Sequence, residues 1–214
     1  GRKAMALVTA MDQPLGRWVG NAAEVAEAVE VLLRKGPGDV RDLSLRLAAS
    51  MVHLGGLAGS PEEAGRLVEE ALDSGRAYGK FEEMVHAQGG DLEAFNERAA
   101  RGGHLADATG VIEAVRSGVV TRCDAKAVGE SLRVLGGGRL ARTETVDPGA
   151  ACHVLKKIGD PVTRGEPLAR AYFSVDESRW SQARRLLEGA FEIGGEAVSP
   201  ALVIDTVESG ETGR

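Results

Sequence analysis

The chain has 214 residues, 43% of them hydrophobic and only 4% aromatic, so its one large or two small domains need cores of Leu, Val and Ala. The formal net charge of −6 and the lack of a basic run argue against a nucleic-acid or anionic-membrane surface. No apolar run is as long as a membrane span. The two cysteines, Cys123 and Cys152, are too few for a disulfide framework and indicate reduced thiols in a cytosolic protein.

The sequence begins with one predicted strand and one well-delimited helix. Residues 4–9 form a short apolar run that is typical of a buried strand. A helix is predicted over residues 22–34, with Asn21 as its N-cap. Glu24 lies three residues after Asn21, which is the spacing of a capping box.

Three more helices are predicted in the first half. Asp39 is expected to cap a helix that is apolar enough to be well buried, through Leu43, Leu45, Leu47, Met51 and Leu54. The run Ser60-Pro61-Glu62-Glu63 is a strong helix start, with a cap, a proline in the first turn and acidic residues near the positive helix end. A further helix carries Phe81, Met84 and Val85 and ends at glycines 89–90.

The second half mixes strands and helices. Apolar residues between 111 and 120 favour strands around a Ser117-Gly118 turn. Asp124 is expected to cap a helix that ends at glycines 136–138, and Ser178 is expected to open another. Short strands are predicted over residues 153–158, 168–173 and 202–204. The fold class is therefore α/β or α+β, with a helix-rich first half and a mixed second half.

Most familiar catalytic and metal-binding patterns are missing. The run Gly136-Gly137-Gly138-Arg139 follows a helix, and the negative end of a helix repels phosphate, so we interpret it as a helix stop. The four histidines share no ligand spacing that would indicate zinc. Residues 156–169 resemble the hammerhead strands of biotinyl and lipoyl carriers, but residues 175–178 lack the Lys that would be modified.

The loop from Asp12 to Gly20 is the best candidate site. Pro14, Gly16 and Gly20 force an irregular backbone, which leaves carbonyl oxygens able to point at a ligand, and Glu27 follows in the next helix. Carbonyl oxygens and one carboxylate suit a hard cation. The alternative is an ordinary strand-to-helix loop beside a solvated Glu27.

Four segments, in order along the chain, resemble the thymidine and pyrimidine-nucleoside phosphorylases. They are residues 6–25 (with Met-Asp-Gln-Pro-Leu-Gly-Arg), 81–89 (Phe-Glu-Glu-Met-Val-His-Ala-Gln-Gly), 135–139 with Asp147-Pro148, and 156–169. The resemblance implies a cytoplasmic homodimer of pyrimidine salvage. Such an enzyme cleaves thymidine or uridine with phosphate as co-substrate, and it uses no organic cofactor.

The resemblance also implies a domain organisation. Residues 1–105 would be the C-terminal portion of the large central α/β domain. Residues 106–214 would be the family's C-terminal α+β domain, with hammerhead-like strands in a barrel-sandwich hybrid. The family's phosphate-binding Lys-x-Ser-x-Gly-Gly loop and its base-binding residues have no match, so we interpret the chain as a C-terminal half that is inactive alone.

One functional set is implied by the resemblance. Some bacterial members bind a structural potassium ion through two backbone carbonyls of the Pro-Leu-Gly-Arg loop and one Glu, and these match Leu15, Trp18 and Glu27. Trp18 replaces the small residue that is common at its position. No catalytic or substrate-binding residue can be assigned. The alternative function is a non-catalytic assembly or binding module that retains the same architecture.

Overall fold

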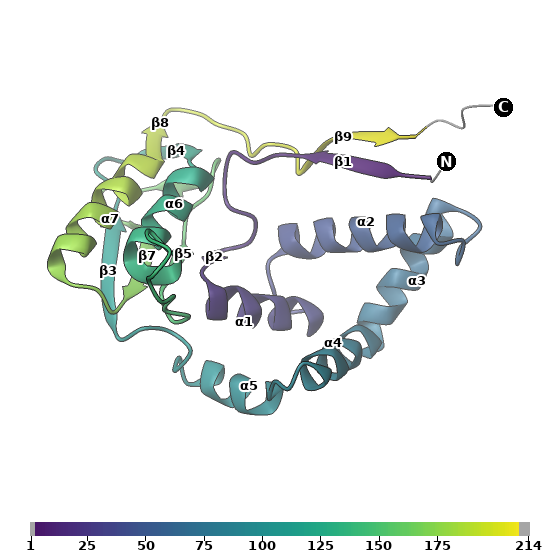
Figure 1. Ribbon diagram of the computed structural model, residues 1–214. Helices are drawn as coiled ribbons and strands as arrows, with labels where there is room; N and C mark the ends of the chain where they lie inside the picture. The colour runs from purple at the N-terminus through teal and green to yellow at the C-terminus, as the bar shows by residue number, and fades with distance from the viewer. Residues whose placement is uncertain (1–2, 210–214) are drawn as a thin grey trace. The chain divides into compact units, whose positions relative to one another are not determined.

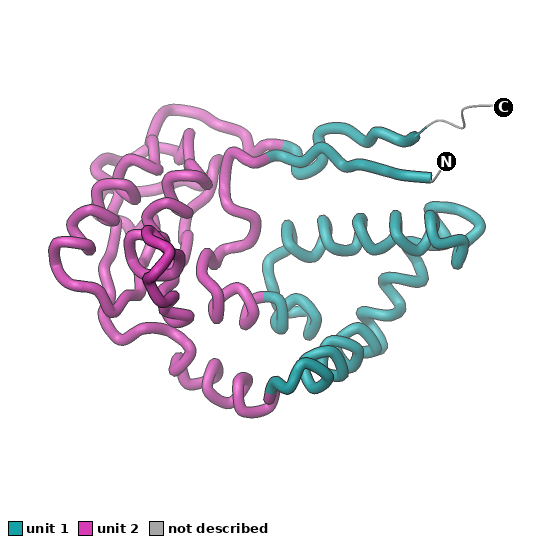
Figure 2. Tube along the Cα trace, viewed as in Figure 1, with its two compact units in different colours: residues 1–10, 28–90, 201–214 teal, residues 11–27, 91–200 magenta. Residues whose placement is uncertain are grey.

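A computed structural model describes residues 3–209, and contacts between Cα atoms divide it into two compact units. The first unit comprises residues 3–10, 28–90 and 201–209, and the second comprises residues 11–27 and 91–200 (Figure 2). The chain therefore passes between the units several times. The predicted division at residue 105 concerns evolutionary domains and stays a prediction.

The first unit combines a two-stranded antiparallel ribbon with helices (Figure 1). Strand β1 (Met5–Thr9) pairs with β9 (Val203–Glu208), which confirms both predicted strands. No residue of β1 is buried, so the expectation of a buried strand is wrong. The helices are the last turn of α1 (Asn21–Leu32), α2 (Gly38–Leu54), α3 (Pro61–Asp73) and α4 (Arg76–Ala87). Helix α3 begins as predicted, because Ser60 Oγ accepts a hydrogen bond from the Glu63 amide over 3.2 Å.

Helix α2 departs from its prediction. None of its residues is buried, and Met51 keeps 73% of its surface exposed. Its apolar residues lie on two stripes rather than one: Leu45, Ala48 and Val52 face the groove shared with α3, whereas Leu43, Leu47 and Met51 lie on another side. A single neighbouring helix covers one stripe, so the expectation that α2 is well buried is wrong for the described residues.

The second unit contains two antiparallel sheets, residues 21–27 of α1 and three complete α-helices (Figure 1). One sheet has the order β2 (Trp18–Val19), β5 (Ala151–Val154), β7 (Pro167–Phe173) and β3 (Ala108–Glu113). The other has the order β6 (Pro161–Val162), β4 (Gly118–Cys123) and β8 (Phe191–Gly194). The helices are α5 (Leu92–Ala100), α6 (Ala125–Leu132) and α7 (Glu177–Ala190). The sequence did not predict α5 or β8.

The strands beside the Ser117-Gly118 turn form, but they join different sheets. Strand β3 pairs with β7, and β4 pairs with β6 and β8. Gly118 permits this arrangement, because a Cβ atom at that position would lie 2.5 Å from the Gly194 carbonyl oxygen. The chain therefore steps from one sheet to the next at this turn.

One apolar core lies inside the second unit. Helices α6 and α7 pack together, and strand residues of both sheets contact them. The largest fully buried apolar side chains include Leu135, Leu187, Val120, Val128 and Val154. Asp124 caps α6 as predicted, with Oδ1 accepting from the Ala127 amide. The cap of α7 is Asp176 rather than Ser178, since its carboxylate accepts from the Arg179 amide.

Candidate functional site

The loop between β1 and α1 is held against the four-stranded sheet of the second unit, since its strand β2 pairs with β5. Pro14 and Gly16 are buried within it, and Gly16 has a φ of 71°. A Cβ atom on Gly20 would lie 2.6 Å from the Ala150 carbonyl oxygen, so only glycine allows this close approach. The Gly20 amide donates to Glu24 Oε1 over 2.9 Å. The helix thus begins one residue earlier than predicted, and the Glu24 carboxylate reaches Gly20 rather than Asn21.

Glu27 ties this loop to the helix that follows it. The residue is 5% exposed, and its Oε1 accepts hydrogen bonds from the Arg17 amide at 2.8 Å and the Trp18 amide at 3.3 Å. A carboxylate acceptor makes such bonds stronger than neutral ones. Glu27 is therefore not solvated, as the alternative expected, but its two hydrogen bonds would equally anchor an ordinary strand-to-helix loop.

Strand pairing fixes the direction of the Trp18 backbone. Trp18 lies opposite His153, and the Val154 amide donates to the Arg17 carbonyl oxygen over 2.7 Å. Hydrogen-bonded pairs alternate with non-hydrogen-bonded pairs in an antiparallel ladder, so Trp18 is in a non-hydrogen-bonded pair. Its N–H and C=O then point away from β5, and its N–H does reach Glu27. The Trp18 carbonyl consequently lies on the edge of β2 that faces Glu27.

The indole of Trp18 packs on the sheet. It stacks on the His153 ring, with centroids 4.1 Å apart and planes 7° apart, and tilts against Tyr172 at 5.7 Å. Burial, followed by the charges of Arg17 and Arg170, lowers the pKa of His153, so the imidazole is neutral at pH 7. The large side chain is therefore accommodated on the sheet without displacing the loop from Glu27.

The donors fit a hard cation in type. Trp18 and Glu27 meet directly, while Leu15 lies in the same loop with a side chain that is 44% exposed. Backbone carbonyls and a carboxylate are oxygen ligands of the kind that Ca²⁺ and K⁺ take. Within residues 3–209, no group of three or more His, Cys, Asp or Glu side chains is placed to hold a metal. At this loop Glu27 is the candidate carboxylate, and any further ligands would have to be backbone oxygens.

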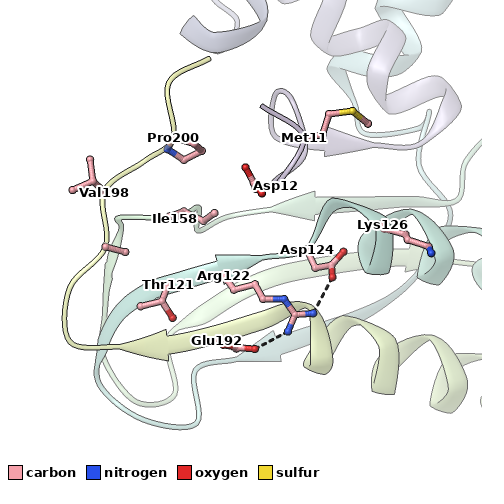
Figure 3. Close-up of a pocket in the computed structure, with 11 residues that line it drawn as sticks. Met11, Asp12, Thr121, Arg122, Asp124, Lys126, Ile158, Glu192, Val198 and Pro200 are labelled. Atoms are coloured by element: carbon pink, nitrogen blue, oxygen red, sulfur yellow. Dashed lines mark hydrogen bonds and ion pairs between the residues drawn. The ribbon is translucent and has the colours of Figure 1, made fainter. Parts of the chain in front are cut away.

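A pocket of about 650 Å³ lies beside Asp12 in the second unit (Figure 3). In this pocket the guanidinium of Arg122 forms ion pairs with Asp124 at 2.8 Å and with Glu192 at 2.7 Å. The hydrogen bond from Arg122, followed by that from the Ala127 amide, lowers the pKa of Asp124. Arg122 is thus neutralised by its neighbours and is poorly placed to bind a phosphate.

The glycine run is a helix end, as predicted. A π-helical turn at Arg133–Gly137 follows α6, and the carbonyl oxygens of its last two glycines accept hydrogen bonds within the fold. Gly136 O accepts from the Asp147 amide at 2.9 Å, and Gly137 O accepts from Asn21 Nδ2 at 3.1 Å. The second contact joins the run to the start of α1, which no sequence pattern indicated.

The remaining candidates lose their chemistry in the fold. Cys123 and Cys152 are buried and free, and desolvation raises their pKa values to about 12 and about 11, so both are inert thiols at pH 7. Residues 175–178 form the cap and first turn of α7. A carrier hairpin is therefore absent at the place where its modified Lys would have to lie.

Several known proteins similar to this chain are pyrimidine-nucleoside phosphorylases. Residues 119–194 match the pyrimidine nucleoside phosphorylase C-terminal domain. The chain is 36% identical over 205 residues to a pyrimidine-nucleoside phosphorylase of Staphylococcus haemolyticus, and 37% identical over 205 residues to one of Staphylococcus aureus. Each alignment covers 95% of this chain and 46% of the relative. A Geobacillus stearothermophilus enzyme of the same name is 38% identical over 83% of this chain and 40% of its own length. The chain thus spans less than half the length of these relatives.

Proposed function

Because this chain is a member of the pyrimidine-nucleoside phosphorylase family, we propose that it forms part of an enzyme that cleaves a pyrimidine nucleoside with phosphate. The products would be the free base and a ribose or deoxyribose 1-phosphate, and thymidine and uridine are the nucleosides to test. The similarity over 95% of the chain is the observation that carries this proposal.

The chemistry needs positioning and charge stabilisation more than covalent catalysis. A phosphate oxygen attacks C1′ while the base leaves through a state with oxocarbenium character, and no bond to the enzyme forms. In the described residues two hydrogen bonds fasten the loop 12–20 to Glu27, and we propose this loop as a wall of the site rather than as a source of acid, base or nucleophile. We therefore assign no catalytic or substrate-binding residue to this chain.

The 214-residue chain is proposed to be inactive by itself. The sequence contains no Lys-x-Ser-x-Gly-Gly phosphate loop, and the Arg122 guanidinium is paired with two carboxylates. The test is phosphate-dependent release of thymine from thymidine and of uracil from uridine by the purified chain. Turnover above a no-enzyme control would contradict this part of the proposal.

A potassium ion is proposed at the loop, with ligands from the carbonyls of Leu15 and Trp18 and the carboxylate of Glu27. When bound, the ion would supply a positive charge that fixes the loop between β1 and α1. The buried carboxylate and the outward-facing Trp18 carbonyl support this ligand set. The chain alone offers fewer oxygens than such an ion needs, so potassium chloride should raise its thermal midpoint no more than sodium chloride does. A potassium-specific rise of several degrees would contradict an incomplete site.

The assembly and location follow from the same family reasoning. We place the enzyme in the cytoplasm, in pyrimidine salvage, as a homodimer, with no organic cofactor and no nucleic-acid partner. Two free, buried thiols support the reducing location, and no helix within residues 3–209 is long and apolar enough to cross a membrane. The strands of residues 106–200 are proposed to form the barrel-sandwich hybrid, supported by two antiparallel sheets around one core.

A non-catalytic assembly module is the second candidate. The second unit favours it, because this unit has its own apolar core and could persist without an adjoining active site. The two candidates differ in one observable. A module would show no phosphorolysis even when the remaining part of a phosphorylase is supplied, whereas an enzyme part would.

A further inference from the structure

The first unit carries apolar surface that its own elements do not cover. Helix α2 has a stripe of Val40, Leu43, Leu47, Met51 and Leu54, spaced three and four residues apart as on one helix face. Leu47, Met51 and Leu54 are 44%, 73% and 38% exposed. Apolar residues at such intervals are the pattern of a helix that packs against a partner.

A second apolar surface lies on the other side of α2. A groove of about 320 Å³ runs between α2 and α3, and its lining is almost entirely hydrocarbon. Its larger side chains are Leu32, Leu45, Val52, Leu67, Val68 and Leu72. Leu67 remains 39% exposed at this groove. The helices of the first unit thus present apolar surface on both sides of α2.

The ribbon of β1 and β9 is the third incomplete feature. In the part of the chain that the structure describes, β1 pairs with β9 alone, and Val8, Ile204 and Val207 are 45%, 64% and 55% exposed. A two-stranded sheet is marginally stable in water, and its unpaired edge can accept another strand. The ribbon is therefore suited to strand addition by another polypeptide segment.

One occupant would satisfy all three features. The relatives are more than twice as long as the segment that aligns with this chain, which covers 46% of them. A short peptide could fill the groove or extend the ribbon, but covering the α2 stripe as well requires a folded polypeptide with both a strand edge and an apolar face. The part of a phosphorylase outside the aligned segment has the length that this requires.

We propose that the α2 stripe, the α2–α3 groove and the edge of β1 form one docking surface for the remaining part of a pyrimidine-nucleoside phosphorylase, and that this part binds even as a separate polypeptide. The proposal rests on the proposed function for the identity of the partner. The interface would bury apolar side chains of α2 and α3 and would add a strand of the partner to the edge of β1 through main-chain hydrogen bonds.

The test uses the full chain and the portion of the Staphylococcus aureus enzyme outside its aligned 205 residues, made as a separate polypeptide. Sedimentation of the mixture should show a complex that contains the two polypeptides in a 1:1 ratio. Met51→Lys and Leu47→Lys should each weaken binding at least about tenfold, because each places a charge on the α2 stripe that the complex would bury. Val115→Lys is the matched control, since Val115 is 80% exposed but lies in the second unit, and it should leave binding unchanged.

A second readout follows one side chain. Hydrogen peroxide should convert exposed Met51 of the free chain to its sulfoxide readily, and the complex should slow this oxidation at least about tenfold. Failure of the two polypeptides to associate would overturn the proposal. Self-association of the chain that Met51→Lys abolishes would also overturn it, by assigning the surface to a second copy.

Phosphorolysis is measured separately on the same mixture. A complex that shows the expected mutant pattern without turnover would leave the docking surface standing and refute the proposed function. If the mixture turns over and both Met51→Lys and Leu47→Lys leave turnover and binding unchanged, the docking surface would be refuted. The proposed function would then stand.

Discussion

Replacement of Glu27 by Ala tests the observation that this carboxylate holds the loop 12–20. The substitution leaves the amides of Arg17 and Trp18 without their acceptor inside a partly buried site. A hydrogen bond to a charged group contributes about 1.5–3 kcal/mol, and an unsatisfied buried donor costs about 1–3 kcal/mol. Since the loop can partly relax toward water, the free energy of unfolding should fall by about 2–4 kcal/mol.

Urea unfolding followed by tryptophan fluorescence and by circular dichroism measures this change. With a slope of roughly 2 kcal/mol per molar urea, the midpoint of the second unit should fall by about 1–2 M. Glu27→Gln keeps one acceptor oxygen and should lose only about 1 kcal/mol. Glu30→Ala, an exposed position on the same helix, should change stability by less than about 0.5 kcal/mol. Equal midpoints for Glu27→Ala and Glu30→Ala would refute the anchoring role.

Three further predictions concern the same unit. Gly20→Ala should destabilise the second unit by about 1–3 kcal/mol, because the new Cβ would lie 2.6 Å from Ala150 O. Gly129→Ala, with open space around it in α6, should instead stabilise the unit by about 0.5–1 kcal/mol. Thermal melts compare the two variants, and similar shifts of the midpoint would contradict the close approach at Gly20. Because the pKa of His153 is lowered in the folded state, the unfolded chain binds more protons below about pH 6.5. The stability that depends on His153 is therefore fully present above that pH and falls as the pH drops toward the folded pKa. His153→Asn should flatten this pH dependence in urea titrations between about pH 7 and 5, and an unchanged slope would disprove it. Cys123 and Cys152 should resist thiol reagents in the native state and react on unfolding, as a colorimetric thiol assay would show; fast labelling of the folded chain would contradict their burial.

Local physics made several elements predictable. Ser60 and Asp124 cap their helices as the sequence indicates, since a cap and its target amide lie within three residues of each other. The missed helix α5 carries the same kind of signal, because Asp91 accepts from the Ala94 amide. Such contacts depend on neighbouring residues alone and can be found before the fold is known.

Features that depend on distant segments were predicted less well. The spacing of apolar residues identified α2 as a helix but did not reveal that its two stripes need two partners. The stacking of Trp18 on His153 joins residues 135 positions apart through the pairing of β2 with β5. The sequence identified Glu27 as a candidate. Its burial could not be predicted, because it depends on the loop placing the Arg17 amide against the carboxylate.

We propose that this chain is part of an enzyme that cleaves pyrimidine nucleosides with phosphate. The most direct measurement is phosphate-dependent release of thymine or uracil by the chain, by the unaligned portion of the Staphylococcus aureus enzyme, and by the two together. We expect release by the mixture and none by either polypeptide alone. Release by this chain alone, or none from a mixture shown to form the 1:1 complex, would contradict this proposal.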